Sequence, residues 1–572
     1  MFIISQREVS ILNNNREQLG SRLGFILLSA GCAIGCGNVW KFPWMTGQYG
    51  GGGFVLVYVL CLLLLGLPAM TMEFAMGRAA QASPVKMYQK LEKPGQKWHI
   101  HGYLCLLGNI ALMAFYTVVT GWMIYYFVQF LTGKTADLGF VNMITNPTVN
   151  VTYLAIAVVV GFAVLSFDLQ GGLERVTKYM MVALFVLMLV LAFHSATLDG
   201  AKEGLSFYLI PDFSKIDGQV IVGAMNQAFF TLSLGIGSMA IFGSYIGKER
   251  SLLGESVNVI LLDTFVAIMA GFIIFPACFT YDITPGAGPA LLFDTMASVF
   301  LNMAGGRIWG TLFFLFMVFA AFSTELAVFE NILACVREMT GWSRPKGCVV
   351  CGVGIFLLSL TTALGYSVWG GFHPFNPDTA WLDFWDFIVS TNLLPVGALV
   401  FSVFCCFKFG WGWDKFVAEA NAGKGLKVQN WMKPVFAYFV PICVAALYIY
   451  GLATFGFSNR LINNVICTIY FIFLGIAIIL SIWKIFIRAG IPGWHCIVPI
   501  LSVYDVCRIS FKDKVGLFTI LSIVFPPFML YTLIKFAKAF GKGIGYGIFL
   551  FLTGGIAYLF LFFDDPKYLG PQ

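Results

Sequence analysis

Long apolar stretches alternate with short polar segments along most of this 572-residue chain. A helix needs about 20 apolar residues to cross the hydrocarbon core of a bilayer. Such stretches fall at residues 23–49, 53–76, 103–131, 151–167, 177–194, 220–246, 256–280, 307–336, 348–366, 384–407 and 434–456, with three more at 462–487, 515–534 and 544–563. They lack the strict alternation of a membrane barrel, so the pattern predicts an all-α polytopic membrane protein.

The composition supports a surface that faces lipid. Hydrophobic residues make up 59% of the chain and charged residues 11%, whereas a soluble domain carries about a quarter charged residues. The net charge of +7 comes from basic residues spread over short loops, which argues against a nucleic-acid partner. Most of the 14 cysteines lie inside apolar stretches without metal-ligand spacing, so we interpret them as small buried hydrophobic residues.

The basic residues also predict an orientation. Lys and Arg cluster in the N-terminal segment and in alternate loops, and residues 365–381 contain neither. By the positive-inside rule, we expect the N-terminus to be cytoplasmic. We also expect the protein to lie in the cell inner (plasma) membrane. We expect a cytoplasmic segment at 1–22, an eleven-span core at 23–457 and a membrane module of about three spans at 458–572, whose topology the charges leave ambiguous.

Two of the apolar stretches are interrupted by residues that suit a helix poorly. The first contains Gly31, Gly35 and Gly37, followed by Asn38 and Lys41. Close helix packing explains small residues, but polar side chains at membrane depth indicate function. The sixth stretch has a similar interruption at residues 227–237. Such a pair predicts an inverted five-plus-five helix repeat in which freed carbonyls bind a cation and freed amides bind a carboxylate.

Several motifs resemble those of the neurotransmitter:sodium symporter family. They lie at residues 22–24, 35–43, 50–54, 73–78, 227–233 and 383–385, within a resemblance that runs in one order from 16 to 456. The eleven-span count is similar to the bacterial, amino-acid-transporting branch. This implies a sodium-coupled symporter that works by alternating access, and not an enzyme. Residues 460–572 resemble a small uncharacterised bacterial membrane family, which implies no chemistry.

The resemblance implies two sodium sites. The first would use Ala33, Asn38, Thr231, Asp263 and the substrate carboxylate. The second would use Gly31, Ile34, Ala320, Ser323 and Thr324. Oxygen ligands suit a hard cation. Taken alone, Ser323 and Thr324 favour bonds to the preceding turn of their own helix; alongside the other motifs they favour sodium.

The resemblance also implies where an amino acid binds. The residues concerned are Cys32, Ala33, Cys36, Gly37, Leu112, Tyr116, Phe230, Thr231, Ser233, Ile236 and Val328. Amides near Cys36 and Gly37 and the Tyr116 hydroxyl would hold the carboxylate, and Ser233 would help hold the ammonium group. Taken alone, the apolar members favour ordinary core. As pocket residues they favour a hydrophobic or aromatic L-amino acid.

Charged residues on either side of the site would form gates. The resemblance pairs Lys41 with Asp383 on the outer side and Arg16 with Glu338 on the cytoplasmic side, and it assigns Glu73 to support the unwound helices. The family usually has arginine where Lys41 stands. Lysine cannot make the bidentate contact of arginine, so we expect a weaker outer gate.

Asp263 is the most informative departure from the animal members, which have asparagine there and bind chloride nearby. A fixed carboxylate at Asp263 supplies the negative charge itself, and two charges 4 Å apart are worth about 4 kcal/mol at an effective dielectric near 20. We therefore expect chloride-independent transport, with proton counter-transport a further possibility. A proton-coupled amino acid carrier of related fold and a non-transporting amino acid sensor stay as alternatives. The amino acid, the sodium stoichiometry and the oligomeric state are open.

Overall fold

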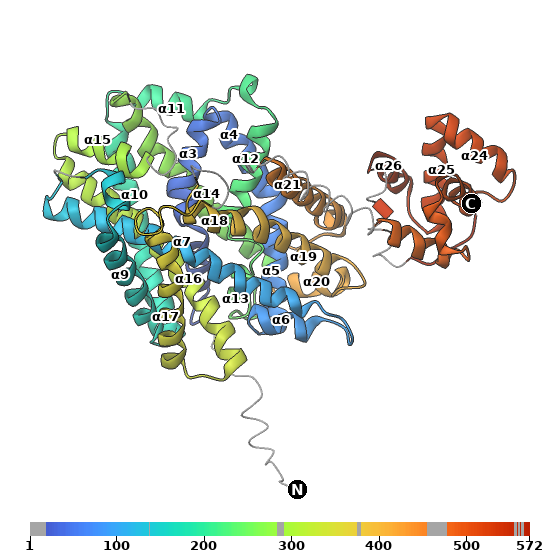
Figure 1. Cartoon of the computed structure of the whole chain (residues 1–572), viewed down its shortest axis with the longest axis horizontal. Coiled ribbons are helices and arrows are strands. Elements are labelled where there is room, and N and C mark those ends of the chain that lie inside the picture. Colours follow the sequence, from blue (N-terminus) through green and yellow to red (C-terminus); the bar gives the residue numbers. More distant parts are fainter. Residues whose placement is uncertain are drawn as a thin grey trace, which may run out of the picture. The chain divides into compact units, whose positions relative to one another are not determined.

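The chain folds into two compact units. The computed structural model describes residues 19–135, 138–282, 291–373, 379–454, 478–553, 557–558, 561 and 566–571. The first unit comprises residues 1–406 and 413–456, and the second comprises residues 407–412 and 457–572 (Figure 1). Each unit is described by itself below.

Long apolar helices dominate the first unit. Nine helical segments in the described part are long and apolar enough to cross a membrane: Gly52–Ala80 (α4 Gly52–Cys61, α5 Leu67–Ala80), α7 His99–Thr132, α9 Pro147–Leu165, Leu169–Ala196 (α10 Arg175–Ala196), α14 Leu252–Thr280, α16 Gly306–Thr340, α17 Arg344–Ala363, Trp381–Cys406 (α18 Trp381–Asp386, α19 Leu394–Cys406) and Asn430–Tyr450 (α21 Val440–Thr454). The bent pair α2 Arg22–Ala33 and Gly37–Gln48 makes ten if it is one span. The prediction of an all-helical polytopic protein is confirmed.

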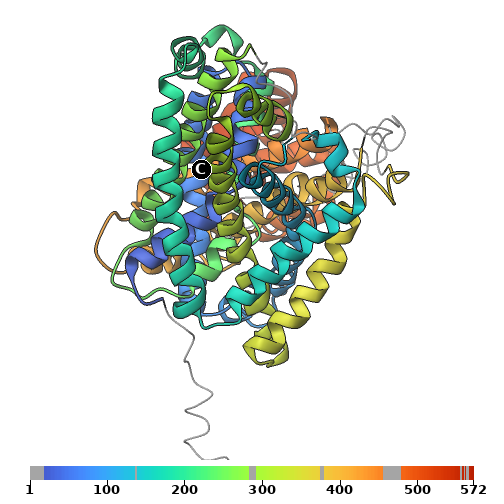
Figure 2. The ribbon, with the colours of Figure 1, turned by 90° about the vertical axis from the view of Figure 1, so that its left-hand side faces the viewer.

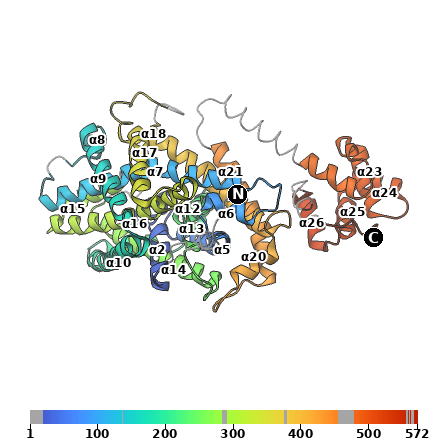
Figure 3. The same ribbon diagram turned by 90° about the horizontal axis from the view of Figure 1, so that it is seen from below.

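Shorter helices connect the long ones. They are α6 Pro84–Leu91, α8 Phe140–Ile144, α11 Ala201–Leu209, α15 Ala297–Asn302 and α20 Trp413–Ala420. Figure 2 shows the long helices of the first unit running side by side. Figure 3 shows α2, α5, α13 and α14 together in the middle of this unit, where α5 packs on α13 and α14 packs on α2 and α5. A second set of neighbours is formed by α7, α9, α16 and α17.

The first stretch breaks where the sequence predicts an interruption. Helix α2 ends at Ala33, Ile34 adopts an extended conformation (φ −72°, ψ 93°), and a π-helical turn at Gly37–Lys41 leads into α3 Phe42–Gln48. The two halves bend by 50°. A side chain at Gly35 would place its first carbon 2.3 Å from the Thr324 hydroxyl and 2.4 Å from the Tyr116 hydroxyl. Glycine therefore lets the break lie directly against α7 and α16.

The sixth stretch also breaks in its middle. Helix α12 Gly218–Thr231 and α13 Ser238–Gly243 flank residues 232–237. Ser233, Gly235 and Gly237 have positive φ values of 49°, 96° and 71°, a region that glycine adopts without steric cost. A side chain at Gly235 would also place its first carbon 2.1 Å from the Leu394 carbonyl oxygen. Backbone conformation and close packing thus both require glycine here.

The second unit contains short helices: α23 Pro499–Ser510, α24 Val515–Val524, α25 Pro526–Ala539 and α26 Ile544–Thr553. The predicted continuous span at 515–534 is wrong, because Phe525 is extended (φ −123°, ψ 99°) and Pro526 begins a new helix. The missing proline N–H and the restriction on the preceding residue explain this break. Most of the run 462–487 and the end of 544–563 lie outside the described residues.

Candidate functional site

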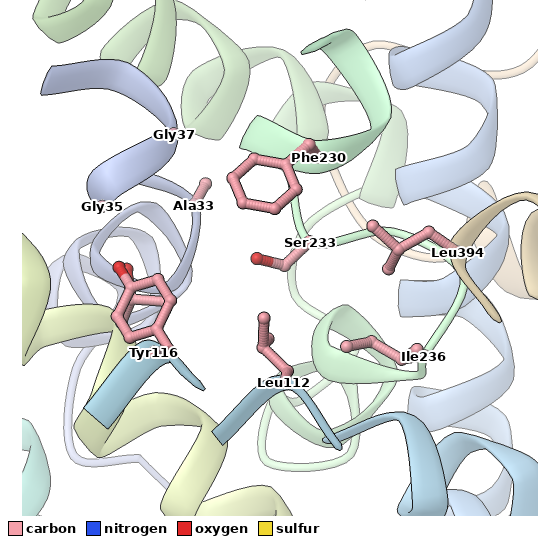
Figure 4. A pocket seen from close by; sticks show the side chains of 10 residues that line it. Ala33, Gly35, Gly37, Leu112, Tyr116, Phe230, Ser233, Ile236 and Leu394 are labelled. Atoms are coloured by element: carbon pink, nitrogen blue, oxygen red, sulfur yellow. The ribbon is translucent and has the colours of Figure 1, made fainter. Parts of the chain in front are cut away.

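A pocket lies between the two helix breaks (Figure 4). Its lining comes from the first break (Ala33, Gly35, Gly37), the second break and its approach (Phe230, Ser233, Ile236), α7 (Leu112, Tyr116), α16 (Thr324) and α19 (Leu394). Figure 4 shows the Phe230 ring on one side of the space, with the hydroxyls of Tyr116 and Ser233 across from each other. Leu112, Ile236 and Leu394 form an apolar end. The chemistry of this lining suits a small molecule with a polar head and an apolar side chain.

Most of the predicted substrate residues line this pocket. They are Ala33, Gly37, Leu112, Tyr116, Phe230, Ser233 and Ile236. Cys32, Cys36, Thr231 and Val328 are buried but are not among its lining residues. The Cys36 amide donates to the Tyr116 hydroxyl at 3.0 Å, so it holds that side chain in place. Leu394 was missed, since a leucine in an apolar run gives no signal until folding brings α19 against Gly235.

The first oxygen cluster is centred on Asp263 of α14. Asn38 Nδ2 donates to Asp263 Oδ1 at 2.8 Å and to the Asp263 carbonyl at 3.1 Å. The Thr231 hydroxyl donates to Oδ1 at 3.4 Å, and the Gly35 amide donates to Asn38 Oδ1 at 3.2 Å. Asp263 is fully buried, and its Oδ2 has no hydrogen-bond partner among the described residues. A carboxylate oxygen is thus available beside the first break.

The surroundings of Asp263 contain other polar groups with spare hydrogen-bonding capacity. The Tyr58 hydroxyl lies near Asp263 and Thr231, and within the described part of the chain it makes no hydrogen bond of good geometry. Gln227 Nε2 donates to the Gly37 carbonyl at 2.7 Å, while its Oε1 has no partner there. Burying unpaired polar atoms is costly. Their concentration at one place indicates a binding site.

The second oxygen cluster joins α16 to the end of α2. The Ser323 hydroxyl lies 3.2 Å from the Ile34 carbonyl and 2.9 Å from the Ala320 carbonyl. The Thr324 hydroxyl lies 3.1, 3.2 and 3.3 Å from the carbonyls of Gly31, Cys32 and Ile34. The hydrogen bonds to carbonyls at the end of α2 show that these hydroxyls do more than bond to the preceding turn of α16. All five residues predicted for the second sodium lie together, and the Cys32 carbonyl joins them.

The chemistry of both clusters fits a sodium ion. Their atoms are carbonyl, hydroxyl, amide and carboxylate oxygens, which suit a hard cation. The first cluster adds a buried negative charge without a basic partner in the described residues around it, whereas the second is neutral. Ala33, the remaining predicted ligand of the first sodium, lines the adjoining pocket.

Glu73 of α5 holds the second break open. Its carboxylate accepts from the Gly235 amide at 2.6 Å and from the Met239 amide at 3.3 Å. The residue is 1% exposed. These amides belong to the interrupted segment and to the first turn of α13, where helical partners are missing. The prediction assigns Glu73 to both unwound helices; among the described residues, these hydrogen bonds join it to the sixth stretch.

The outer gate differs from the prediction. Lys41 Nζ lies 4.0 Å from Asp386 Oδ1 and 3.8 Å from the centre of the Phe230 ring. Asp383, the predicted partner, instead accepts from the Ala380 amide at 2.7 Å and caps α18. Its place in the first helical turn explains this, because free amides there attract a carboxylate. Asp386 stands one turn further along and faces Lys41.

The cytoplasmic gate is only partly described. Arg16 lies outside the described residues. Glu338 accepts from the Ser83 amide at 3.0 Å and from the Ser83 hydroxyl at 2.7 Å, which fixes the start of α6. The predicted pair of Arg16 and Glu338 therefore stays a prediction.

Two broken helices, a pocket between them and oxygen clusters beside the first break are features of a secondary transporter. Comparisons with known proteins identify the family to which the chain belongs. The model of the Sodium:neurotransmitter symporter family matches residues 16–150 and 138–490. The chain belongs to this family, whose members are transporters and not enzymes. Residues 494–571 match a family of unknown function (DUF5684).

Individual relatives agree with this assignment. An uncharacterized sodium-dependent transporter of Haemophilus influenzae is 32% identical, over 77% of this chain and 99% of that protein. The uncharacterized sodium-dependent transporter YhdH of Bacillus subtilis is 33% identical, over 76% and 97%. The crystal structure of MhsT in complex with L-phenylalanine is 35% identical, with a TM-score of 0.70, and covers 76% of this chain and 100% of that one. The chain is therefore a multi-pass sodium-dependent transporter with the fold of that structure.

Proposed function

We propose that this protein takes up a hydrophobic or aromatic L-amino acid by sodium-coupled symport, through alternating access and without a requirement for chloride. The observation that supports this best is the buried carboxylate of Asp263, whose Oδ2 has no described partner and which lies beside the first helix break. A buried charge needs a partner of opposite sign. A sodium ion held by Asp263, Asn38, Thr231 and the Ala33 carbonyl supplies it.

The pocket supports the choice of substrate. The amino acid carboxylate would face the Tyr116 hydroxyl and the amides of the first break, and its ammonium group would face carbonyls of both breaks and the Ser233 hydroxyl. Its side chain would occupy the apolar end at Leu112, Ile236 and Leu394. No charged side chain lines this end among the described residues. MhsT, which shares the fold, has L-phenylalanine bound in its crystal structure.

The binding of sodium and the binding of substrate are coupled because their opposite charges neutralise each other. The substrate carboxylate completes the shell of the first sodium, and that sodium neutralises the carboxylate, so each raises the affinity for the other. A second sodium at Ser323 and Thr324 would tie the end of α2 to α16. Because this cluster lies where α2 packs directly on α16, its occupancy would bias which side of the membrane is open.

The direction of transport rests on the orientation. The basic loops favour a cytoplasmic N-terminus, and we place the protein in the inner (plasma) membrane. Lys41, with Asp386 and Phe230, would then close the pocket toward the outside. The sodium gradient and about 2.3 kcal/mol per charge per 100 mV of membrane potential would drive inward accumulation.

Uptake by purified full-length protein in liposomes tests the proposal. We expect radiolabelled L-phenylalanine to accumulate above its equilibrium level when sodium is outside, and not when choline replaces it. Replacing chloride by gluconate should leave the rate unchanged. Competition by the twenty amino acids should favour large apolar ones over charged ones. Protein-free liposomes give the background.

The contrary outcomes are distinct. Accumulation that persists in choline and follows a proton gradient would indicate a proton-coupled carrier. Saturable binding without flux would indicate a sensor. Strong competition by lysine or glutamate would contradict the proposed substrate class while leaving sodium coupling intact.

A further inference from the structure

The second unit contains a helix whose polarity is inverted relative to that of a water-soluble protein. In α24 the buried positions are Thr519 and Ser522. Four of its large apolar side chains are instead exposed, namely Leu517 (54%), Ile520 (61%), Ile523 (53%) and Val524 (74%), while Phe518 and Leu521 are partly buried. Water would not favour this arrangement, because apolar area is stabilised only when it leaves water. Lipid as the surrounding medium accounts for it, since polar side chains then gain by facing the protein interior.

The buried side of α24 forms a hydrogen-bonded seam with its neighbours. The hydroxyls of Ser522 and Thr532 lie 2.9 Å apart, and the Cys507 sulfur lies 3.5 Å from the Ser522 hydroxyl. Ser510 donates to the Thr532 carbonyl at 3.2 Å. These contacts join α23, α24 and α25, so the exposed apolar side chains all belong to the opposite face. Polar residues inside and apolar residues outside are typical of membrane-embedded helices.

Helix α24 is too short to cross a bilayer by itself, and α25 folds back on it, with the rings of Phe518 and Phe528 5.5 Å apart. Helix α24 has 10 residues, which at 1.5 Å per residue is about 15 Å, half the hydrocarbon thickness. It ends at Phe525, which is 56% exposed, followed by the exposed Pro526 and Pro527. Helix α25 then runs for 14 residues. An apolar tip at 525–527 suits the middle of a bilayer, and the missing proline N–H groups leave fewer donors unsatisfied there.

Basic side chains mark the other ends of both helices. Lys512 and Lys514 precede α24, and Lys538 lies near the end of α25; all three are exposed. Asp513 is the acidic residue of the first group, so the pair of ends keeps a net positive charge. Lysines next to a membrane-inserted segment bind anionic lipid headgroups, and they concentrate on the cytoplasmic side.

We infer that α24 and α25 form a re-entrant hairpin that enters the cytoplasmic leaflet from one side, with its lysine-bearing base bound to anionic lipid headgroups. The apolar face of α24 and the tip at 525–527 contact acyl chains. Both ends of the hairpin return to the same surface. This inference concerns only the second unit and does not depend on the substrate or the ion of the first.

Spin labels in the full-length protein in nanodiscs test the insertion. Cysteine variants on the exposed apolar face of α24 (Ile520→Cys, and Val524→Cys next to the tip) should be relaxed by oxygen, which partitions into lipid, and not by a water-soluble nickel chelate. Variants at the base (Asp513→Cys, Gly543→Cys) should respond to nickel instead. A side chain at Gly543 meets no atom within 4 Å, so this change leaves the packing intact. The unsubstituted protein, labelled in parallel, gives the contribution of native cysteines.

Sidedness separates a hairpin from a crossing. A membrane-impermeant thiol reagent should modify Asp513→Cys and Gly543→Cys from the same, cytoplasmic, face of oriented vesicles. Modification from opposite faces would overturn the inference in favour of a transmembrane crossing. Nickel access at Val524→Cys would place the helix in water, and access of neither reagent would place it against protein. Each of these results contradicts a lipid-inserted tip.

Lipid retention tests the base. In nanodiscs of phosphatidylglycerol and phosphatidylethanolamine, the protein should retain phosphatidylglycerol preferentially after detergent extraction. A triple change of Lys512, Lys514 and Lys538 to Gln should lower this preference at least about twofold. A control triple change of the exposed Lys202, Lys415 and Lys427 to Gln removes the same charge from residues outside α24 and α25. An equal effect of both triple changes would contradict headgroup binding at the hairpin.

Discussion

The Asp263 cluster and the Ser323–Thr324 cluster both lie against the first helix break, yet they differ in charge and in how fully their polar atoms are hydrogen-bonded. In the first, a carboxylate keeps one oxygen without a described partner although Asn38 and Thr231 are in contact with the other. In the second, both hydroxyls already donate to the carbonyls that would share an ion with them. The carboxylate of the first cluster therefore depends on a cation for neutralisation. The hydroxyls of the second cluster can satisfy their hydrogen bonds without an ion.

This difference assigns different tasks to the two clusters. A buried carboxylate interacts strongly with a cation. A neutral hydroxyl that binds a cation must give up a hydrogen bond to a carbonyl, so its net gain in binding free energy is small. We expect the Asp263 cluster to set the affinity for sodium and substrate together. The Ser323–Thr324 cluster should mainly set how tightly α2 is held to α16, and hence the balance between outward-open and inward-open states.

Asp263→Asn should have the largest effect. Losing a charge about 4 Å from the ion removes about 4 kcal/mol at an effective dielectric near 20, on the order of a thousandfold in the sodium concentration for half-maximal substrate binding. Binding of radiolabelled L-phenylalanine against a sodium titration measures this. Chloride should partly restore the variant and leave the parent unchanged. Asp212→Asn, at an exposed loop carboxylate, is the control. An unchanged sodium requirement would remove Asp263 from the ion site.

Gly35→Ala should come next, because Gly35 contacts both clusters. Its amide donates to Asn38, and the added carbon would lie 2.3 Å from the Thr324 hydroxyl. Overpacking of this kind costs about 1–3 kcal/mol, or roughly 5- to 150-fold in affinity. Sodium and substrate affinities should fall together in the same binding assay.

The control for this change is Gly354→Ala, since no atom lies within 4 Å of the added carbon. Elution of both variants as a single detergent-solubilised species checks their folding. A loss of substrate affinity with normal sodium dependence would show that Gly35 shapes only the pocket.

Ser323→Ala and Thr324→Val should each have a smaller effect. A neutral hydrogen-bonding group contributes about 1 kcal/mol, so each change should raise the half-maximal sodium concentration about fivefold. Thr311→Val is the matched control on the same helix, because that hydroxyl donates only to Arg307 within α16. A defect as large as that of Asp263→Asn would contradict the proposed division between the clusters.

Lys41→Arg should have the smallest effect and should alter neither cluster. Arginine can contact Asp386 with two N–H groups, but partly exposed ion pairs contribute no more than about 1 kcal/mol. We expect substrate to dissociate about two- to fivefold more slowly, with unchanged sodium dependence. The gain should vanish in an Asp386→Asn background and persist with Asp383→Asn. The reverse pattern would restore Asp383 as the gate partner.

The places where the two helices break could be predicted from local sequence. Clustered glycines with Asn38 in the first stretch, and Ser233, Gly235 and Gly237 in the sixth, disfavour a continuous helix whatever surrounds them. The breaks in turn determine which backbone oxygens are available. For this reason most of the predicted ion and substrate residues are brought together by the structure.

Other features depended on geometry that no local pattern contains. Asp383 and Asp386 have the same chemistry, and only the start of α18 decides that one caps the helix while the other faces Lys41. Leu394 enters the pocket because α19 packs against Gly235. In the second unit, hydrophobicity over 515–534 suggested one crossing, but Pro526 and Pro527 divide it into two helices.

By itself, the sequence determined the membrane setting, the two interruptions, the oxygen-rich character of the site and the presence of a separate C-terminal unit. These depend on hydrophobicity, glycine conformation and side-chain chemistry, which are properties of short segments. Tertiary structure decided the gate partner, the full pocket lining, the hydrogen bonding of the second cluster and the inverted polarity of α24. Each of these depends on distances between segments far apart in the chain, which only packing fixes.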